Sequence, residues 1–149
     1  MDGFYQPQSK LMYCIKHQIQ INSEAKNVYV ALTSIEGLSE WWTHLTSGSS
    51  EIDGIIEFKF DPPYGMKMKV ISLRTDAYVK WECIQGEPDW IGTLITFDLE
   101  QTRGKTTLRF KHDKWPTQED FYAHCNLSWA KYLLSLRSYI ETGKGQPFQ

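Results

Sequence analysis

The stretch TQEDFYAHCNLSWAKYLLSLRSYIETG, residues 117–143, decides the fold of this chain. Its apolar side chains recur every three or four residues, which predicts a helix with one buried stripe. We expect about 26 helical residues, roughly 39 Å at the rise of an α-helix. Thr117 to Asp120 has the form of a capping box, and Gly143 provides the stop. The stripe consists of Phe121, Cys125, Trp129, Tyr132, Leu133, Leu136 and Ile140.

Segments of alternating apolar and polar side chains precede this helix. Such alternation is typical of strands in a sheet that has one face buried against the core and one face exposed to solvent. The links between them are short, including a tight hairpin at Arg103-Gly104, so we predict an antiparallel meander of five or six strands. The predicted strands cover residues 12–21, 56–60, 66–70, 77–83, 93–99 and 106–112.

Two short helices are predicted after the first strand. Asn22-Ser23 offers an N-cap, and residues 24–33 repeat apolar side chains at helical spacing before Gly37 breaks the segment. The second helix runs through Leu38, Trp41 and Trp42. Because adjacent helical residues face different directions, we expect one tryptophan in the core. The other would act as a lid at a cavity mouth, contact a partner, or cap the end of the sheet.

A long helix with a single apolar stripe must bury that stripe, and the apolar face of the sheet is the available partner. Since a sheet of this width twists and coils, it can wrap around the helix. We therefore predict an α+β helix-grip fold, in which a curved antiparallel sheet surrounds the long C-terminal helix. Residues 11–145 are expected to form this single domain, preceded by a flexible tail over residues 1–10.

Composition narrows the possible functions. The chain has 149 residues, a formal net charge of −2 and an aromatic content of 14%, which is more ring-bearing bulk than a minimal core needs. It contains no basic run suited to nucleic acid and no apolar stretch approaching the about 18 residues of a membrane span. The first residues do not resemble a signal peptide. We expect a cytoplasmic protein that binds neither nucleic acid nor membrane.

The motifs argue against a cofactor, a metal or a familiar catalytic site. Cys14, Cys83 and Cys125 are odd in number and form no C-x-x-C, which fits a reducing compartment without disulfide or zinc. No nucleophile elbow, phosphate-binding glycine loop or H-E-x-x-H appears. The carboxylates Glu57, Glu82, Asp98 and Glu100 alternate onto the polar face of the predicted sheet, among lysines and Arg109.

Several segments resemble the START-like, or Bet v 1-like, superfamily, also known as SRPBCC. They are closest to the group named for the activator of Hsp90 ATPase homologues. This resemblance implies a helix-grip fold with an internal cavity, but it carries no catalytic residues over, because the superfamily houses lipid and hormone binders, cyclases, aromatases and co-chaperone domains. The segments are 28–33, 37–43, 93–100, 106–112, 129–136 and 141–145.

The predicted inward face supplies a candidate ligand site. Aromatic rings and methionines there suit the wall of a pocket for a flat or hydrophobic molecule, although the same residues could instead pack on one another and leave no room. His112 shares this face and is either a ligand contact or a histidine satisfied by its surroundings. The candidates are Trp41, Trp42, Phe58, Phe60, Met66, Met68, Trp81, Phe97, Phe110, His112, Phe121 and Trp129.

The sequence leaves three functions open. The first is a module that binds a hydrophobic or aromatic small molecule, as a monomer or a homodimer. The second is a co-chaperone-like interaction domain that uses an exposed surface around Trp41, Trp90 or Trp115. The third is a cyclase or aromatase, which would need at least two interior ionisable groups to converge; the available ones are His112, His17, Tyr122 and Tyr132.

Overall fold

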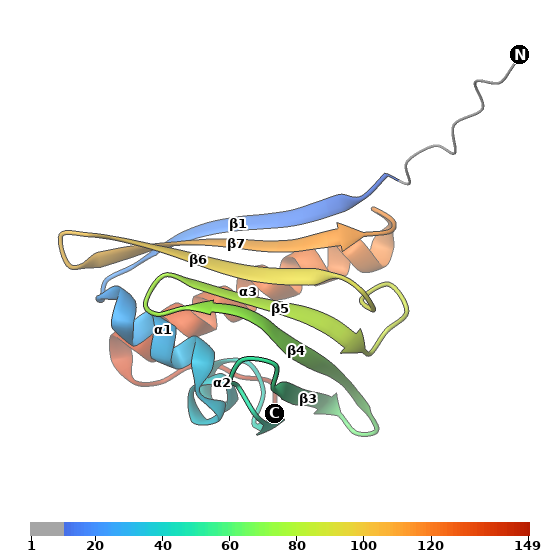
Figure 1. Cartoon of the computed structure of the whole chain (residues 1–149), viewed down its shortest axis with the longest axis horizontal. Coiled ribbons are helices and arrows are strands. Elements are labelled where there is room, and N and C mark those ends of the chain that lie inside the picture. The colour runs from blue at the N-terminus through green and yellow to red at the C-terminus, as the bar shows by residue number, and fades with distance from the viewer. Residues whose placement is uncertain (1–10) are drawn as a thin grey trace, which may run out of the picture.

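The computed structural model describes residues 11–149, and the predicted tail over residues 1–10 lies outside this range. A seven-stranded antiparallel sheet forms the body of the fold in the order β1-β7-β6-β5-β4-β3-β2 (Figure 1). The strands are β1 (Tyr13–Ile21), β2 (Leu45–Gly48), β3 (Ile55–Asp61), β4 (Tyr64–Arg74), β5 (Tyr78–Gln85), β6 (Leu94–Thr102) and β7 (Lys105–Trp115).

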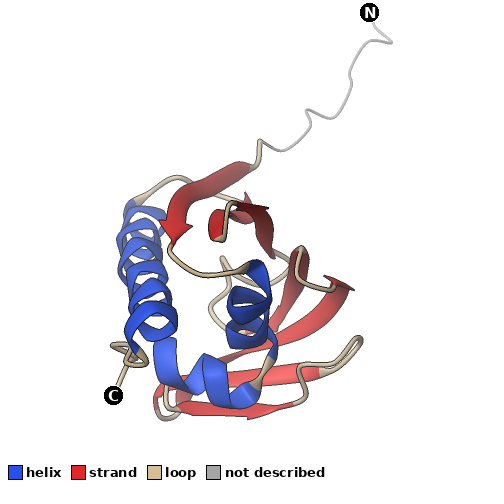
Figure 2. Cartoon of the chain, turned by 90° about the vertical axis from the view of Figure 1, so that its left-hand side faces the viewer, coloured by secondary structure: helices blue, strands red, loops and turns tan. Residues whose placement is uncertain are grey.

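Three helices complete the fold: α1 (Ala25–Thr33), α2 (Ile35–Trp41) and the long α3 (Asp120–Thr142). Figure 2 shows α3 standing opposite the curved sheet, with α1 and α2 lying at one end of the trough. The buried stripe of α3 faces the sheet through Cys125, Trp129, Leu133 and Leu136. The predicted α+β helix-grip fold is therefore confirmed, including the two short helices after the first strand.

The strand count is one detail that the prediction missed. The sheet has seven strands rather than five or six, because Leu45–Gly48 adds a short edge strand beside β3. This segment reads Leu-Thr-Ser-Gly and is mostly exposed, so it has no alternation that would identify a strand. The predicted hairpin at Arg103-Gly104 is confirmed, since both residues have positive φ between β6 and β7.

The break between the short helices lies at Ser34, not at Gly37 as predicted. The hydroxyl of Ser34 accepts a hydrogen bond from the backbone N–H of Gly37 at 3.0 Å and caps α2. Gly37 itself is buried inside α2, where a Cβ would come within 2.9 Å of the Ala31 backbone. Glycine is needed here for the close approach of α2 to α1 rather than to end a helix.

The start of α3 also differs from the prediction. The helix begins at Asp120, its N-cap is Glu119, and no side chain caps it, so the capping box predicted over Thr117–Asp120 does not form. The end is as predicted: Gly143 adopts the left-handed conformation with φ of 83° and donates its N–H to the carbonyl of Tyr139. Likewise, α1 begins at Ala25, whose N–H is bound by the Gln101 side chain instead of the predicted Asn22-Ser23 cap.

Aromatic rings fill most of the space between the sheet and α3. Trp42 lies at the centre, with ring centroids 4.2 Å from Phe58 and 4.9 Å from Trp129. The prediction placed one of Trp41 and Trp42 in the core, whereas the structure buries both. Trp42 is the C-cap of α2, just after the last helical residue, Trp41, and the two indoles stack with their centroids 5.9 Å apart.

Candidate functional site

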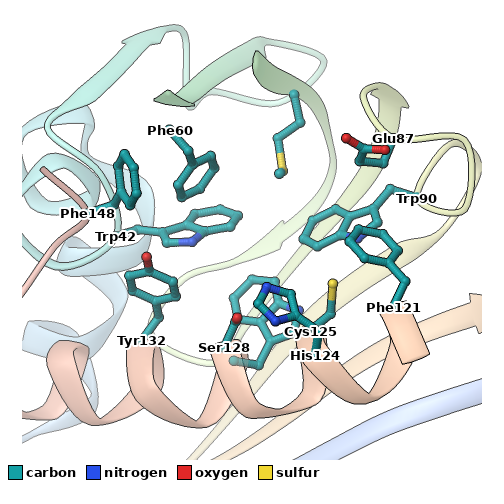
Figure 3. A pocket seen from close by; sticks show the side chains of 12 residues that line it. Trp42, Phe60, Glu87, Trp90, Phe121, His124, Cys125, Ser128, Tyr132 and Phe148 are labelled. Carbon is teal, nitrogen blue, oxygen red and sulfur yellow. The ribbon is translucent and has the colours of Figure 1, made fainter. Parts of the chain in front are cut away.

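A pocket of about 260 Å³ remains at one side of this aromatic core. It lies along α3 and is walled by rings from several elements (Figure 3). Its lining is almost entirely apolar, and the few polar groups come from one acidic residue, one histidine, one serine and one tyrosine. The lining residues are Trp42, Phe60, Met66, Glu87, Trp90, Phe121, His124, Cys125, Ser128, Trp129, Tyr132 and Phe148.

The pocket has two distinct ends. Phe148 lies at one end, beside Phe60 and Trp42, and Trp90 and Phe121 lie at the other (Figure 3). The base between them comes from successive turns of α3. Residues spaced three or four apart on one helix share a face, which is why a single helix supplies so much of the lining.

The structure places the twelve predicted site residues in two groups. Five line the pocket: Trp42, Phe60, Met66, Phe121 and Trp129. The other seven pack in the core behind it and do not line it: Trp41, Phe58, Met68, Trp81, Phe97, Phe110 and His112. Phe121 is the most exposed of the five, with 36% of its surface accessible, because it sits on the first turn of α3 at the mouth of the pocket.

His112 is a core residue with both ring nitrogens satisfied. Its Nδ1 accepts a hydrogen bond from the indole Nε1–H of Trp129 at 3.0 Å. An indole nitrogen can only donate, so Nδ1 carries no proton and the neutral ring holds its proton on Nε2. That nitrogen lies 2.8 Å from the Thr93 hydroxyl, which in turn donates to the carbonyl of Trp90. Burial lowers the pKa of His112 from 6.5 to about 3.

This chain of hydrogen bonds holds one wall of the pocket in place. It connects Trp129 on α3, through His112 on β7, to the backbone of Trp90 in the loop after β5. The rings also pack on one another, with Trp90 and His112 centroids 4.5 Å apart and edge to face. His112 therefore acts on the pocket indirectly, by positioning two of its tryptophans.

Trp90 is a lining residue that the sequence prediction missed as part of the site. It lies in the irregular loop between β5 and β6, where neither helical nor strand periodicity marks the inward residues. Only 6% of its surface is exposed, and within residues 11–149 its Nε1 has no nitrogen or oxygen partner. Its indole lies beside the Cys125 thiol in the pocket wall (Figure 3).

The polar groups of the pocket are neutral or lie at its edge. Burial raises the pKa of the Cys125 thiol to about 11, so it is not a nucleophile at neutral pH. Burial likewise raises the pKa of Tyr132. Glu87 and His124 are exposed and lie at the rim. The chemistry that this arrangement favours is contact with an apolar molecule that has a polar group directed toward the solvent.

Two other predicted arrangements do not form. Trp41, Trp90 and Trp115, proposed as an exposed interaction surface, are all buried, since each packs within the aromatic core. The four candidates for acid–base chemistry do not converge. His17 and Tyr122 contact backbone carbonyls at the junction of β1 and α3, and His112 is enclosed, which leaves Tyr132 as the one member that lines the pocket.

The curved sheet, the enclosed long helix and the two short helices define a START-like domain. The comparisons with known proteins agree, and they identify the group within that superfamily. The family model described as "Activator of Hsp90 ATPase homolog 1-like protein" matches residues 22–141, so the chain belongs to this family. Membership fits the ligand-binding fold of the superfamily. No curated protein matches the sequence.

Solved structures give the same assignment. The Aha1 dimer from Colwellia psychrerythraea is 39% identical, has a TM-score of 0.82, and aligns over 89% of this chain and 99% of its own. A Mesorhizobium loti protein is 17% identical, with a TM-score of 0.76 over 87% of this chain and 97% of its own. CalU16 from Micromonospora echinospora is 13% identical, with a TM-score of 0.73 over 89% of this chain and 69% of its own. The last two are similar in fold alone.

No helix within residues 11–149 combines the length and the apolar character that crossing a bilayer requires.

Proposed function

We propose that this protein is a binding module for a small hydrophobic or aromatic molecule, held in the pocket along α3. The observation that carries the proposal is the lining itself. Rings from α3, the C-cap of α2, the sheet and two loops face one open volume, with polar groups confined to a few positions. This combination of an apolar wall and a few polar groups is characteristic of ligand sites.

The size of the pocket limits the ligand. At about 260 Å³ it lies just below the range of about 300–1,000 Å³ that is usual for drug-sized ligands. We therefore propose a molecule with one or two fused rings, or a short acyl chain, rather than a long-chain lipid. Its polar substituent would lie toward Glu87 and His124 at the rim. The three free cysteines support a reducing, cytoplasmic location.

Substitution Ser128→Phe tests the site. Ser128 lies on the pocket-facing side of α3 between Cys125 and Tyr132 (Figure 3). A phenyl ring there would occupy the volume that a ligand needs. With naphthol as the probe, isothermal titration calorimetry should show binding to the wild type and a loss of about tenfold or more in affinity for the variant.

The matched control is Val30→Phe, which adds similar bulk to an exposed position on α1, away from the pocket. We expect it to bind naphthol as the wild type does. If the Ser128→Phe variant binds naphthol as tightly as the wild type does, naphthol binds outside the pocket along α3. That result would contradict the proposed binding site. The melting temperatures of both variants are measured as well, to check that each variant is folded when its naphthol affinity is compared with that of the wild type.

We also propose that the protein forms a homodimer through the outer face of α3. Leu127 and Leu134 are 65% and 47% exposed, one heptad apart. Ala123 and Ala130 continue the same stripe at spacings of four and three residues, and small residues allow close approach of a second helix. The similar Colwellia protein is described as a dimer in solution, which supports a second copy of this chain as the occupant.

Substitution Leu127→Glu should convert the dimer to a monomer, because it places a charge in the centre of the proposed contact. Light scattering after size-exclusion chromatography would then report half the wild-type mass. Ile52→Glu, at another exposed site, in the loop between β2 and β3, should leave the mass unchanged. A wild-type protein that is already monomeric, or a Leu127→Glu variant that stays dimeric, contradicts this interface.

A further inference from the structure

The residues after α3 fold back onto the domain and reach the pocket. The N–H of Gln146 donates to the hydroxyl of Ser135 at 2.7 Å, and that hydroxyl donates to the carbonyl of Trp41. Gly145 passes so close to the carbonyl oxygen of Glu40 that a Cβ at this position would collide with it. The segment beyond the predicted boundary at residue 145 is thus closely fitted to α2 and α3.

Phe148 is fixed by its backbone. Its N–H donates to the carbonyl of Trp42 at 2.8 Å, and its carbonyl accepts from His44 at 3.5 Å. Thr43 and Phe148 form an isolated parallel bridge. Because these bonds involve only main-chain atoms, they hold the residue in place whatever side chain it carries.

The side chain of Phe148 forms the end wall of the pocket. Its ring meets that of Phe60 edge to face with centroids 5.6 Å apart, and it lies beside Trp42 at one end of the lining (Figure 3). Tyr132 and Phe60 continue this end, with their centroids 6.4 Å apart. A ligand lying along α3 would meet the Phe148 ring before it could extend further in that direction.

The end wall lies outside the part of the chain that the family model matches. That match ends at residue 141, whereas Phe148 follows seven residues later, since 148 − 141 = 7. All the other lining residues, including Trp42, Trp90 and Trp129, lie within the matched range. The general form of the pocket is therefore built by the common domain, and its length is set by a segment beyond it.

We propose that Phe148 is the specificity-determining residue that restricts this pocket to ligands of one or two rings. The inference rests on the proposed binding function and adds to it the residue that selects by size. Truncation to alanine removes the end wall but keeps the main-chain bonds to Trp42 and His44. The pocket should then lengthen along α3 while the tail stays in place.

The test compares naphthol with the larger hydroxypyrene by isothermal titration calorimetry. The wild type should bind naphthol and should bind hydroxypyrene much more weakly. Phe148→Ala should bind hydroxypyrene at least about tenfold more tightly than the wild type does, with naphthol affinity changed by less than about threefold. Tyr64→Ala, which removes an exposed ring outside the pocket lining, should behave as the wild type.

The possible failures are distinguishable. If naphthol binds the wild type but the ratio of the two affinities is the same in Phe148→Ala, the size-selecting role is wrong and the binding function stands. If naphthol does not bind the wild type, the binding function itself is wrong and the inference falls with it. Phe148→Leu provides a second variant should alanine destabilise the fold, and it should give an intermediate ratio.

Discussion

Replacing Trp129 with alanine should lower the free energy of unfolding by about 3–5 kcal/mol, as is usual for loss of a buried large aromatic side chain. The indole is 2% exposed and lies against Phe110 and Trp42, with centroids 4.4 and 4.9 Å away. The substitution also leaves Nδ1 of His112 without its donor in a buried site. Because domains of this size are stable by only about 5–15 kcal/mol, much of the total would be lost.

Chemical denaturation at neutral pH measures this effect, and two further variants separate its causes. Trp129→Phe keeps most of the ring but removes the N–H, so it should lose about 1–3 kcal/mol, the penalty of leaving the His112 acceptor unsatisfied. Phe121→Ala removes another aromatic ring from the same helix, but from its partly exposed first turn, and should lose about 1 kcal/mol. If Trp129→Ala is no more destabilising than Phe121→Ala, Trp129 is not a central packing residue.

The fold was predictable because its main elements carry strong periodic signals. The stripe from Cys125 to Leu136 identifies a helix whose single apolar face needs a partner, and alternating strands provide that partner. Details set by single hydrogen bonds were not predictable in this way. The cap of α1 comes from Gln101, which is 76 residues away in sequence, and no local pattern announces such a contact.

The candidate site was predictable only in its chemistry. Alternation separates inward from outward residues, but it does not tell which inward rings fill the core and which border a pocket. Phe58 and Phe60 share one face of β3, yet Phe58 is fully buried and Phe60 lines the pocket. The pairing of β3 with β4 shifts register between Lys59 and Asp61, so Phe60 lies where the strand departs from a regular ladder, and such a shift depends on the neighbouring strand.

Two lining residues, Trp90 and Phe148, lie in irregular segments where no period applies. Their side chains reach the pocket through turns and an isolated bridge. Trp90 stands among turn residues in the sequence, which gives no sign that its side chain points into a pocket. From the sequence alone, it is therefore considered only as part of an exposed interaction surface. Such residues become recognisable only when segments distant in sequence are placed together.

The pH dependence of stability should reveal the buried neutral state of His112. The pKa of its ring falls from 6.5 to about 3 on folding because burial disfavours the charged form. Between these values the unfolded chain binds a proton that the folded protein does not. The contribution of neutral His112 to the free energy of unfolding is therefore fully present above pH 6.5. It is lost as the pH falls toward 3, at about 1.4 kcal/mol per pH unit.

His112→Gln isolates this effect, because other titrating groups are common to both proteins and cancel in the difference. Denaturant unfolding at pH 6.5 and at about pH 5 should show the wild type losing about 2 kcal/mol more than the variant over this interval. The ring signals of His112 in NMR spectra of the wild type should stay constant over the same range, with the proton on Nε2. A titration midpoint near pH 6.5 would mean that the folded protein accepts the proton. In that case the hydrogen bonds from Trp129 and to Thr93 could not both exist as described, since a protonated Nδ1 has no lone pair to offer the indole.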